Sequence, residues 1–318
     1  MVRLPKIVNI FRRRKFPISF VYSDAYWLVD IGNHVFPTKK YRLIYEKLLF
    51  MGVKKQNFFS PEPALDEDIL LVHTSKYIKK LRTGRLSRSE IMELELPYKP
   101  EIFDFAKLAV GGTILATRLA MESRLAVHIG GGFHHAFPDH GEGFCVLNDI
   151  AVSLAKAKQE GAIKRGMVVD CDVHQGNGTA AIFSDEESIF TFSLHQMDLY
   201  PAQKPASNLD VGMWSGDGDE KYIPLLKSRF PQLYREFEPD LILYLAGADP
   251  YEGDQLGGLR LTQEGLEERD RIIIGEALKL DIPIAVVLAG GYAADVGDTV
   301  SIHLNTIKTA QSLFRKYH

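Results

Sequence analysis

The sequence predicts an α/β fold: a single domain in which a central, mostly parallel β-sheet is flanked by helices on both faces. Continuous apolar runs of strand length recur along the 318 residues, helical patterns separate them, and most runs end in glycine or polar residues. Apolar runs without alternation are typical of strands buried on both faces, as in a parallel sheet. Alternation of strands with helices favours helices on both sides of that sheet.

Six apolar runs rich in Val, Ile, Leu or Phe are the predicted strands. In chain order they are 18–23 (ISFVYS), 125–132 (LAVHIGGG), 166–173 (GMVVDCDV), 188–195 (SIFTFSLH), 240–249 (DLILYLAGAD) and 282–292 (IPIAVVLAGGY). The second run ends in three glycines, where the backbone must turn or approach another group closely.

Four segments have the apolar spacing of helices: 103–122, 147–161, 262–280 and 299–317. Asn148 or Asp149 is a plausible cap for the second, with Gly161 as its stop, and Thr262 opens the third beside acidic residues. We find no internal repeat or linker, so we expect a basic N-terminal extension over 1–17, with RRRK at 12–15, and one domain over 18–318.

Composition narrows the classes of partner. The chain is 46% hydrophobic and 25% charged with a formal net charge of -3, so no overall attraction to nucleic acid or an anionic membrane is expected. Only two cysteines are present, Cys145 and Cys171, which favours a reducing compartment and hence a cytoplasmic location. No apolar run reaches the roughly 18 residues that a membrane span needs. The sequence does not indicate an oligomeric state.

Polar residues cluster at the ends of four predicted strands. His134 and His135 follow the second run, Asp170 to His174 close the third, Asp249 ends the fifth and Tyr292 ends the last. Sites in open α/β sheets form outside the carboxyl ends of the strands. We therefore expect these four strand ends to converge on one crevice.

Asp172, His174 and Asp249 offer one nitrogen and two carboxylate ligands. Three protein ligands with an open position are typical of catalytic zinc, and the same donors accept Fe(II), Co(II) or Mn(II). The D-x-D-x-H spacing also arises by chance in a solvated loop, but the buried run before it and the second acid at another strand end favour a metal site.

Acid–base chemistry needs further groups. His134 and His135 can divide the tasks of base and acid if Asp170 and Asn177 orient them, and a carboxylate partner raises imidazole basicity more than an amide does. Tyr292 can donate a hydrogen bond to a carbonyl oxygen that gains charge. Each has an ordinary alternative: a capping or surface histidine pair, and a core tyrosine among the 13 tyrosines.

Five separate blocks together resemble the zinc-dependent histone deacetylase family, which has the arginase-deacetylase fold. They are GGGFHHAFPDHGEGFCVLNDIAVS, VVDCDVHQGNGTA, SLHQMDLYP, YLAGADPYEGDQLGGLRLT and AGGY, in the family's order, and the resemblance runs from about residue 18 to near the C-terminus. The phrases GGGFHH, DVHQGNG and EGDQLGGL are most similar to class IV and its bacterial relatives.

The resemblance implies a role for each matching residue. Asp172, His174 and Asp249 match the zinc ligands; His135 matches the proton shuttle, His134 its electrostatic partner, Asp170 the acid oriented toward His134, and Tyr292 the residue that polarises the scissile amide. The implied substrate channel comprises Gly143, Phe144, Tyr200, Gly290 and Gly291, and the implied potassium site uses oxygens of Asp170, Asp172, His174, Ser193 and Leu194. Asn177 departs from the acid of classes I and II and agrees with class IV.

The implied function is removal of acyl groups, acetyl or longer fatty acyl, from lysine side chains by a metal-activated water. Class IV resemblance implies that long chains are favoured. Two alternatives stay open at this stage: an acylpolyamine amidohydrolase, and a catalytically silent acyl-lysine binder. An arginase-type ureohydrolase is disfavoured because it needs a binuclear manganese site with additional strand-end acids.

Overall fold

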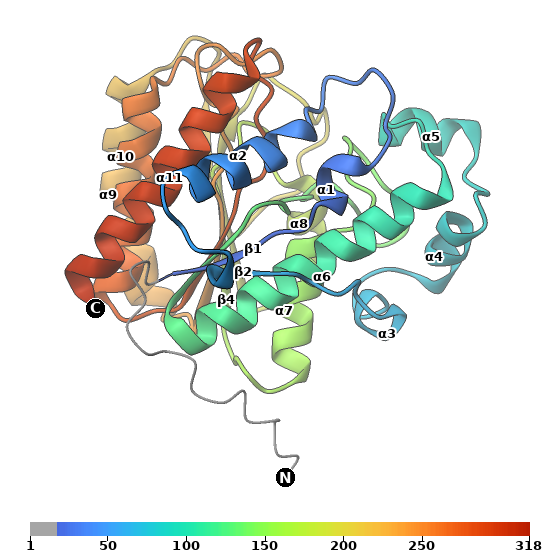
Figure 1. Ribbon diagram of the computed structural model, residues 1–318, viewed down its shortest axis with the longest axis horizontal. Helices are drawn as coiled ribbons and strands as arrows, with labels where there is room; N and C mark the ends of the chain where they lie inside the picture. Colours follow the sequence, from blue (N-terminus) through green and yellow to red (C-terminus); the bar gives the residue numbers. More distant parts are fainter. Residues whose placement is uncertain (1–17) are drawn as a thin grey trace.

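An eight-stranded sheet organises the fold, and every strand pair in it is parallel. The computed structural model of the chain describes residues 18–318 (Figure 1), and the basic extension expected at 1–17 lies outside the described residues. The strands are β1 (Ser19–Val21), β2 (Phe58–Phe59), β3 (Leu125–His128), β4 (Gly166–Asp170), β5 (Ile189–Gln196), β6 (Leu209–Met213), β7 (Leu241–Leu245) and β8 (Ile284–Val287). All six predicted strands are confirmed; β2 and β6 are additional.

The strand order is β2-β1-β3-β8-β7-β4-β5-β6, so the short strands β2 and β6 are the two edges. Edge position explains why the sequence pattern missed them. β2 has only two residues, both half-buried, and β6 alternates between half-buried and exposed positions before its buried end. The continuous apolar signal belongs to the central strands, whose residues are buried throughout.

Eleven α-helices of the described chain surround the sheet. They are α1 (Ala25–Leu28), α2 (Lys39–Phe50), α3 (Asp66–Ile69), α4 (Ser75–Arg82), α5 (Arg88–Leu94), α6 (Pro100–Ser123), α7 (Asp149–Gln159), α8 (Asn177–Ile182), α9 (Asp219–Phe237), α10 (Gln263–Lys279) and α11 (Val296–Tyr317). The four predicted helices correspond to α6, α7, α10 and α11. The side chains of Asn148 and Thr262 cap α7 and α10, as expected, by accepting from the backbone N–H groups of Ala151 and Gly265.

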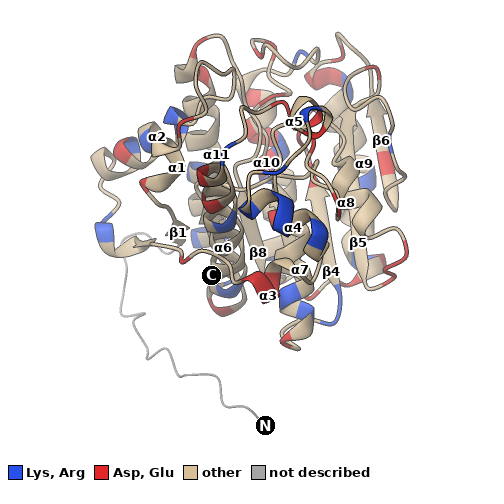
Figure 2. Ribbon diagram, turned by 90° about the vertical axis from the view of Figure 1, so that its right-hand side faces the viewer, with Lys and Arg blue, Asp and Glu red and all other residues tan. Residues whose placement is uncertain are grey.

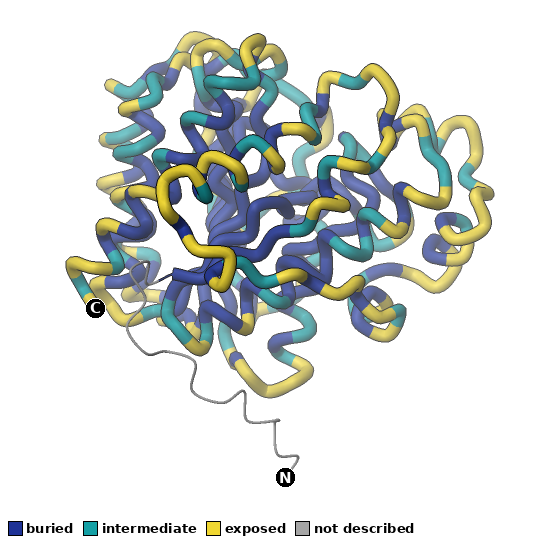
Figure 3. Tube along the Cα trace, viewed as in Figure 1, coloured by how far each residue is buried: buried dark blue, intermediate teal, exposed yellow. Residues whose placement is uncertain are grey.

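Two buried layers lie on opposite faces of the sheet. Met167, Val169 and Tyr244 pack on one face under α2, α9, α10 and α11, while Val168 and Leu243 pack on the other under α7 and the end of α6. Successive strand residues point to opposite faces, which accounts for this division. Figure 1 shows the helices on both sides, and Figure 3 shows the strands as the most deeply buried part of the trace.

The strands β3, β8, β7 and β4 are consecutive in the sheet, and these are the four whose ends carry the predicted site residues. The crossovers bring together segments more than a hundred residues apart, such as Asp172 after β4 and Gly290 after β8, which share a hydrogen bond. The predicted convergence of strand ends is therefore confirmed.

Surface charge is mixed in sign on the face shown in Figure 2, where the basic residues of α4 lie near the acidic residues of α3. Among residues 18–318, no helix is both long enough and apolar enough to cross a membrane.

Candidate active site

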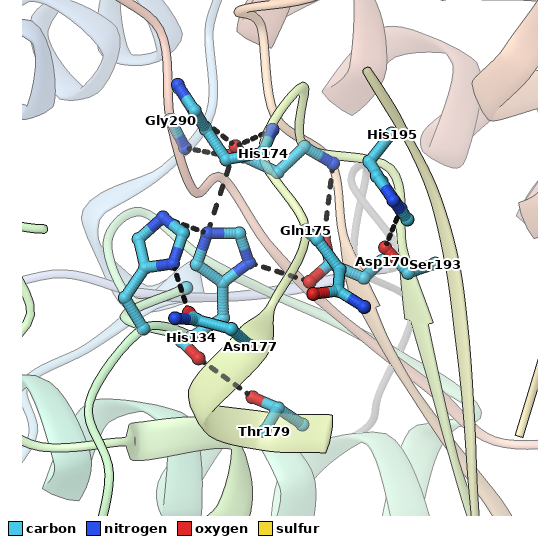
Figure 4. Close-up of polar contacts among 12 residues, drawn as sticks. His134, Asp170, His174, Gln175, Asn177, Thr179, Ser193, His195 and Gly290 are labelled. Carbon is cyan, nitrogen blue, oxygen red and sulfur yellow. Dashed lines mark hydrogen bonds and ion pairs between the residues drawn. The ribbon is translucent and has the colours of Figure 1, made fainter. Parts of the chain in front are cut away.

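Three buried residues that could bind a metal ion meet where β4 and β7 end. One donor atom from each of Asp172, His174 and Asp249 lies within 4.8 Å of the others. Backbone amides fix the carboxylates: Gly290 N–H donates to Asp172 Oδ2 at 3.0 Å, and Val173 N–H donates to Asp249 Oδ1 at 2.9 Å. Figure 4 shows His174 and Gly290 on adjacent loops above the sheet. The three predicted ligand residues therefore lie together, and their binding of a metal stays a prediction.

The free oxygen of Asp249 tests whether this cluster suits a cation. Asp249 Oδ2 is buried and has no hydrogen-bond partner in the described structure, and it lies 3.7 Å from His174 Nδ1. Burial raises the pKa of Asp249 to about 7, and the adjacent charge of Asp172 adds to the rise. A buried carboxylate oxygen without a donor is costly unless a cation binds it. Two carboxylates and one imidazole match a zinc or ferrous site with an open position.

The tandem histidines lie beside this cluster and differ in their partners. His134 Nδ1 is 2.6 Å from Asp170 Oδ2, while His135 Nδ1 is 2.6 Å from Asn177 Oδ1. The two Nε2 atoms are 3.1 Å apart, so one ring donates to the other. Figure 4 shows His134, Asp170 and Asn177, the last at the start of α8.

Electrostatics separate the two rings. Burial opposes protonation of His134, but the charges of Asp170 and Asp172 outweigh it and raise the pKa of His134 to about 9. Burial lowers the pKa of His135 well below its usual range, and positive charge on His134 and His174 adds to that effect. His134 is therefore the charged member of the pair, and His135 is the neutral member that can accept a proton.

Tyr292 is held by the loop between β8 and α11. Its backbone N–H donates to Asp254 Oδ2 at 2.7 Å, and the side chain of Gln255 donates to its carbonyl at 2.8 Å. Burial raises the pKa of the Tyr292 hydroxyl well above its usual range, and the nearby carboxylates Asp172 and Asp249 add to it. The phenol therefore stays protonated and available as a donor.

A cavity of about 340 Å³ opens onto these groups. Its lining includes His134, His135, Asp172, His174 and Tyr292, together with the predicted channel residues Gly143, Phe144, Tyr200 and Gly290. The ring of Tyr200 meets the ring of His135 edge-on, with centroids 5.0 Å apart.

Gly291 is the one predicted channel residue that does not line the cavity. A Cβ built there would lie 2.7 Å from Thr299 Cγ2 and 2.9 Å from Ala248 Cβ, so Gly291 packs against the protein behind the loop. The expectation for Gly291 is corrected accordingly: its φ of 142° and close packing shape the loop, and it does not form the wall.

Two residues of the site, Phe36 and Lys40, were not predicted from the sequence. Phe36 lines the cavity and stacks on Phe144, with ring centroids 6.4 Å apart. Lys40 is fully buried and donates through Nζ to the carbonyl of Ala289, directly before Gly290. Both residues come before the first of the five blocks that resemble the family. From sequence alone, a single phenylalanine there cannot be told from an ordinary core residue, nor a single lysine from an ordinary surface residue.

Of the predicted potassium residues, Asp170 ends β4, Asp172 and His174 follow it in the loop, and Ser193 and Leu194 lie on β5. Asp170 is directly opposite Ser193 in the parallel register, and Leu194 follows on β5. Ser193 Oγ is 2.9 Å from His195 Nδ1, as Figure 4 shows. Whether these oxygens hold potassium stays a prediction.

Comparisons with known proteins identify a family model and several proteins that are similar to this chain. Residues 34–307 match the family model described as histone deacetylase domain. The chain is 38% identical to an uncharacterised protein of Picosynechococcus sp., over 94% of this chain and 99% of that protein. It is 31% identical to Histone deacetylase 2 of Arabidopsis thaliana, over 86% of this chain and 74% of the relative.

Two further matches extend the likeness. A protein of Methanothermobacter thermautotrophicus named as a probable deacetylase is 29% identical, over 86% of this chain and 85% of its own length. The crystal structure of the HDA15 HD domain aligns with a TM-score of 0.77 at 23% identity, covering 93% of this chain and 88% of that one. At this identity the structural match shows a shared fold.

Proposed function

The chain belongs to the histone deacetylase family, and on that premise we propose that it is a zinc-dependent amide hydrolase that removes acyl groups from lysine side chains. The observation that carries the proposal is the buried Asp172–His174–Asp249 cluster, of which Asp172 and His174 line one cavity with His135 and Tyr292. A divalent cation held there supplies Lewis-acid activation of water and of the amide carbonyl. The class IV assignment within the family rests on Asn177 and remains part of the proposal.

His135 is the group suited to accept the proton of the attacking water. It is neutral, and its Nε2 lies 3.1 Å from His134 Nε2. His134, held protonated by Asp170, places a positive charge beside it and limits how strongly it binds the proton. The same ring can then release that proton to the departing lysine amine, so one residue serves as base and acid in turn.

Tyr292 donates its hydroxyl proton in a hydrogen bond to the substrate carbonyl oxygen as that oxygen gains negative charge. A preorganised donor in a buried cavity is worth more than one in water because no solvent needs to reorient. Phe144 and Tyr200 contact the aliphatic stem of the lysine and keep water out.

We also propose that acyl groups longer than acetyl are accepted. Support comes from the cavity volume of about 340 Å³ and from its mostly apolar lining, which includes Phe36, Phe133 and Leu256. A potassium ion bound by oxygens of β4, of the loop that follows it and of β5 is a further part of the proposal. So is a cytoplasmic location, which the two free cysteines support.

A panel of fluorogenic lysine peptides carrying acetyl, octanoyl or myristoyl groups tests the function. We expect hydrolysis that a chelator abolishes and added zinc restores, with a higher kcat/KM for the longer chains. Hydrolysis of acetylputrescine but not of the peptides would instead identify a polyamine substrate. Tight binding of acyl-lysine without turnover would identify a binding protein and refute the proposal.

A further inference from the structure

Glu142 accepts hydrogen bonds from Asn177, the partner of His135, and from Tyr200 of the channel wall, and we infer that it is a positioning residue that fixes the tautomer of His135 through Asn177. The inference rests on the proposed hydrolase function for its kinetic consequences. Glu142 precedes Gly143 in the short loop before α7, where its backbone pairs with Cys145. Its side chain is 15% exposed and turns inward.

A continuous chain of hydrogen bonds joins the carboxylate to the base. Asn177 Nδ2 donates to Glu142 Oε1 at 3.0 Å, and Asn177 Oδ1 is 2.6 Å from His135 Nδ1. An ionised carboxylate can only accept hydrogen bonds. The amide nitrogen of Asn177 must therefore face Glu142, which turns the amide oxygen toward His135.

That orientation fixes the tautomer of His135. Because an amide oxygen can only accept, His135 Nδ1 carries the proton and Nε2 keeps its lone pair. Without Glu142, the Asn177 amide could turn over, present its nitrogen to His135 and favour the tautomer that cannot act as base.

The same carboxylate oxygen also holds the channel wall. The hydroxyl of Tyr200 donates to Glu142 Oε1 at 2.6 Å. The other oxygen, Oε2, lies 3.9 Å from His140 Nε2 at the surface. Oε1 thus accepts from both Asn177 and Tyr200. The position of Tyr200 in the channel is therefore linked to the orientation of the Asn177 amide beside His135.

Glu142 also bears on how basic His135 is when its partner at position 177 is an amide and not a carboxylate. A carboxylate in direct contact would raise the basicity of His135, and an amide does so much less. Here the negative charge stands one hydrogen bond further away, where it polarises the amide without making a charged pair with His135. The chain of hydrogen bonds from Glu142 through Asn177 therefore keeps the proton of His135 on Nδ1 and raises the basicity of the ring only slightly.

The test uses the full-length zinc-loaded chain and the substitutions Glu142→Gln, Asn177→Asp and their combination. Glu142→Gln replaces the obligatory acceptor by a group that can also donate, so we expect kcat to fall about 10-fold to 100-fold, with a smaller change in KM. Asn177→Asp alone places two carboxylates together and is also expected to lose turnover. The combination restores an acceptor-only group between two donors, and we expect its kcat to return close to that of the wild type.

Glu93→Gln is the matched control, because Glu93 is an exposed carboxylate near Glu142 and His140 that makes no hydrogen bond to Asn177 among the described contacts. We expect wild-type kinetics for it. The ring tautomer is measured independently by long-range ¹H–¹⁵N NMR of histidine-labelled protein. His135 should carry its proton on Nδ1 in the wild type and the combined variant, and the Nε2–H form should appear in Glu142→Gln.

Unchanged kcat and an unchanged His135 tautomer in Glu142→Gln would overturn the inference. So would a combined variant whose loss equals the product of the two single losses. A wild-type chain that does not hydrolyse any acyl amide would refute the proposed function, while the NMR result would still decide the role of Glu142.

Discussion

Replacement of Asp249 by asparagine should make the metal-free protein more stable at neutral pH while abolishing metal binding. The substitution keeps the size of the side chain and an oxygen that can accept from Val173 N–H. Its amide nitrogen replaces Oδ2, which has no hydrogen-bond partner among the described residues, while Oδ1 is the atom that accepts from Val173 N–H. What it removes is a buried negative charge beside a second carboxylate.

The magnitude follows from the pKa of Asp249 in the folded chain, which burial and then the charge of Asp172 raise from 3.8 to about 7. In the unfolded chain the group ionises near its ordinary value. Stability from the protonated form is therefore fully present below about pH 4 and is lost as the pH rises through 7. At 1.36 kcal/mol for each pH unit, the loss above pH 7 is about 4 kcal/mol.

Urea unfolding in the presence of chelator, followed by circular dichroism from about pH 4 to pH 8, measures this difference. Wild type and Asp249→Asn should be similar in stability at pH 4 and differ by about 4 kcal/mol, in favour of the variant, at pH 8. Added zinc should stabilise the wild type and leave the variant unchanged. Asp185→Asn, at an exposed position, controls for the loss of one charge.

A stability difference between wild type and Asp249→Asn that is the same at pH 4 and pH 8 would refute the reasoning, because the effect is assigned to one titrating carboxyl. Stabilisation of the variant by zinc equal to that of the wild type would show that Asp249 is not a ligand.

Three further predictions concern the residues around the ligands. Tyr292→Phe should lose about 10²-fold to 10³-fold in kcat while keeping one metal per chain, measured by steady-state kinetics and elemental analysis; full activity would remove the hydroxyl from the mechanism. Gly143→Ala places a Cβ 2.8 Å from both His135 Cδ2 and the Tyr200 hydroxyl at a φ of 49°, so kcat should fall about 10²-fold with metal content intact; wild-type turnover would show that the wall can shift freely. Lys40→Met leaves the Ala289 carbonyl without its donor and should lower the free energy of unfolding by about 1–3 kcal/mol. Lys39→Met, at an exposed position, is the control and should not lower it. Equal effects of the two substitutions on the midpoint of urea unfolding would contradict this prediction.

The central strands and the ligand cluster were predictable from the sequence because both leave local patterns. β3, β4, β7 and β8 are buried on both faces and therefore appear as unbroken apolar runs, and the polar residues at their ends needed only the rule for parallel sheets to be placed together. The roles given to Phe144 and Tyr200 came from family resemblance, since an aromatic residue in a loop has no pattern of its own.

Other contributions depend on contacts between distant segments. Glu142 and Asn177 are 35 residues apart, and nothing near either residue shows that they share a hydrogen bond. Lys40 reaches Ala289 across 249 residues, and a lysine at the start of an amphipathic helix is ordinarily solvated. The expectation for Gly291 was wrong for a related reason: two adjacent glycines in one loop are equivalent in sequence, and only the fold decides which of them faces the cavity.

The most direct test of the central claim is a titration of the metal-free chain with zinc while amine release from an acyl-lysine peptide is followed. If Asp172, His174 and Asp249 form the catalytic centre, activity should rise linearly and stop at one zinc per chain, and Asp249→Ala should show no rise. Full hydrolysis before any metal is added would contradict the account, as would a wild-type chain that binds one zinc at this cluster and hydrolyses no acyl amide.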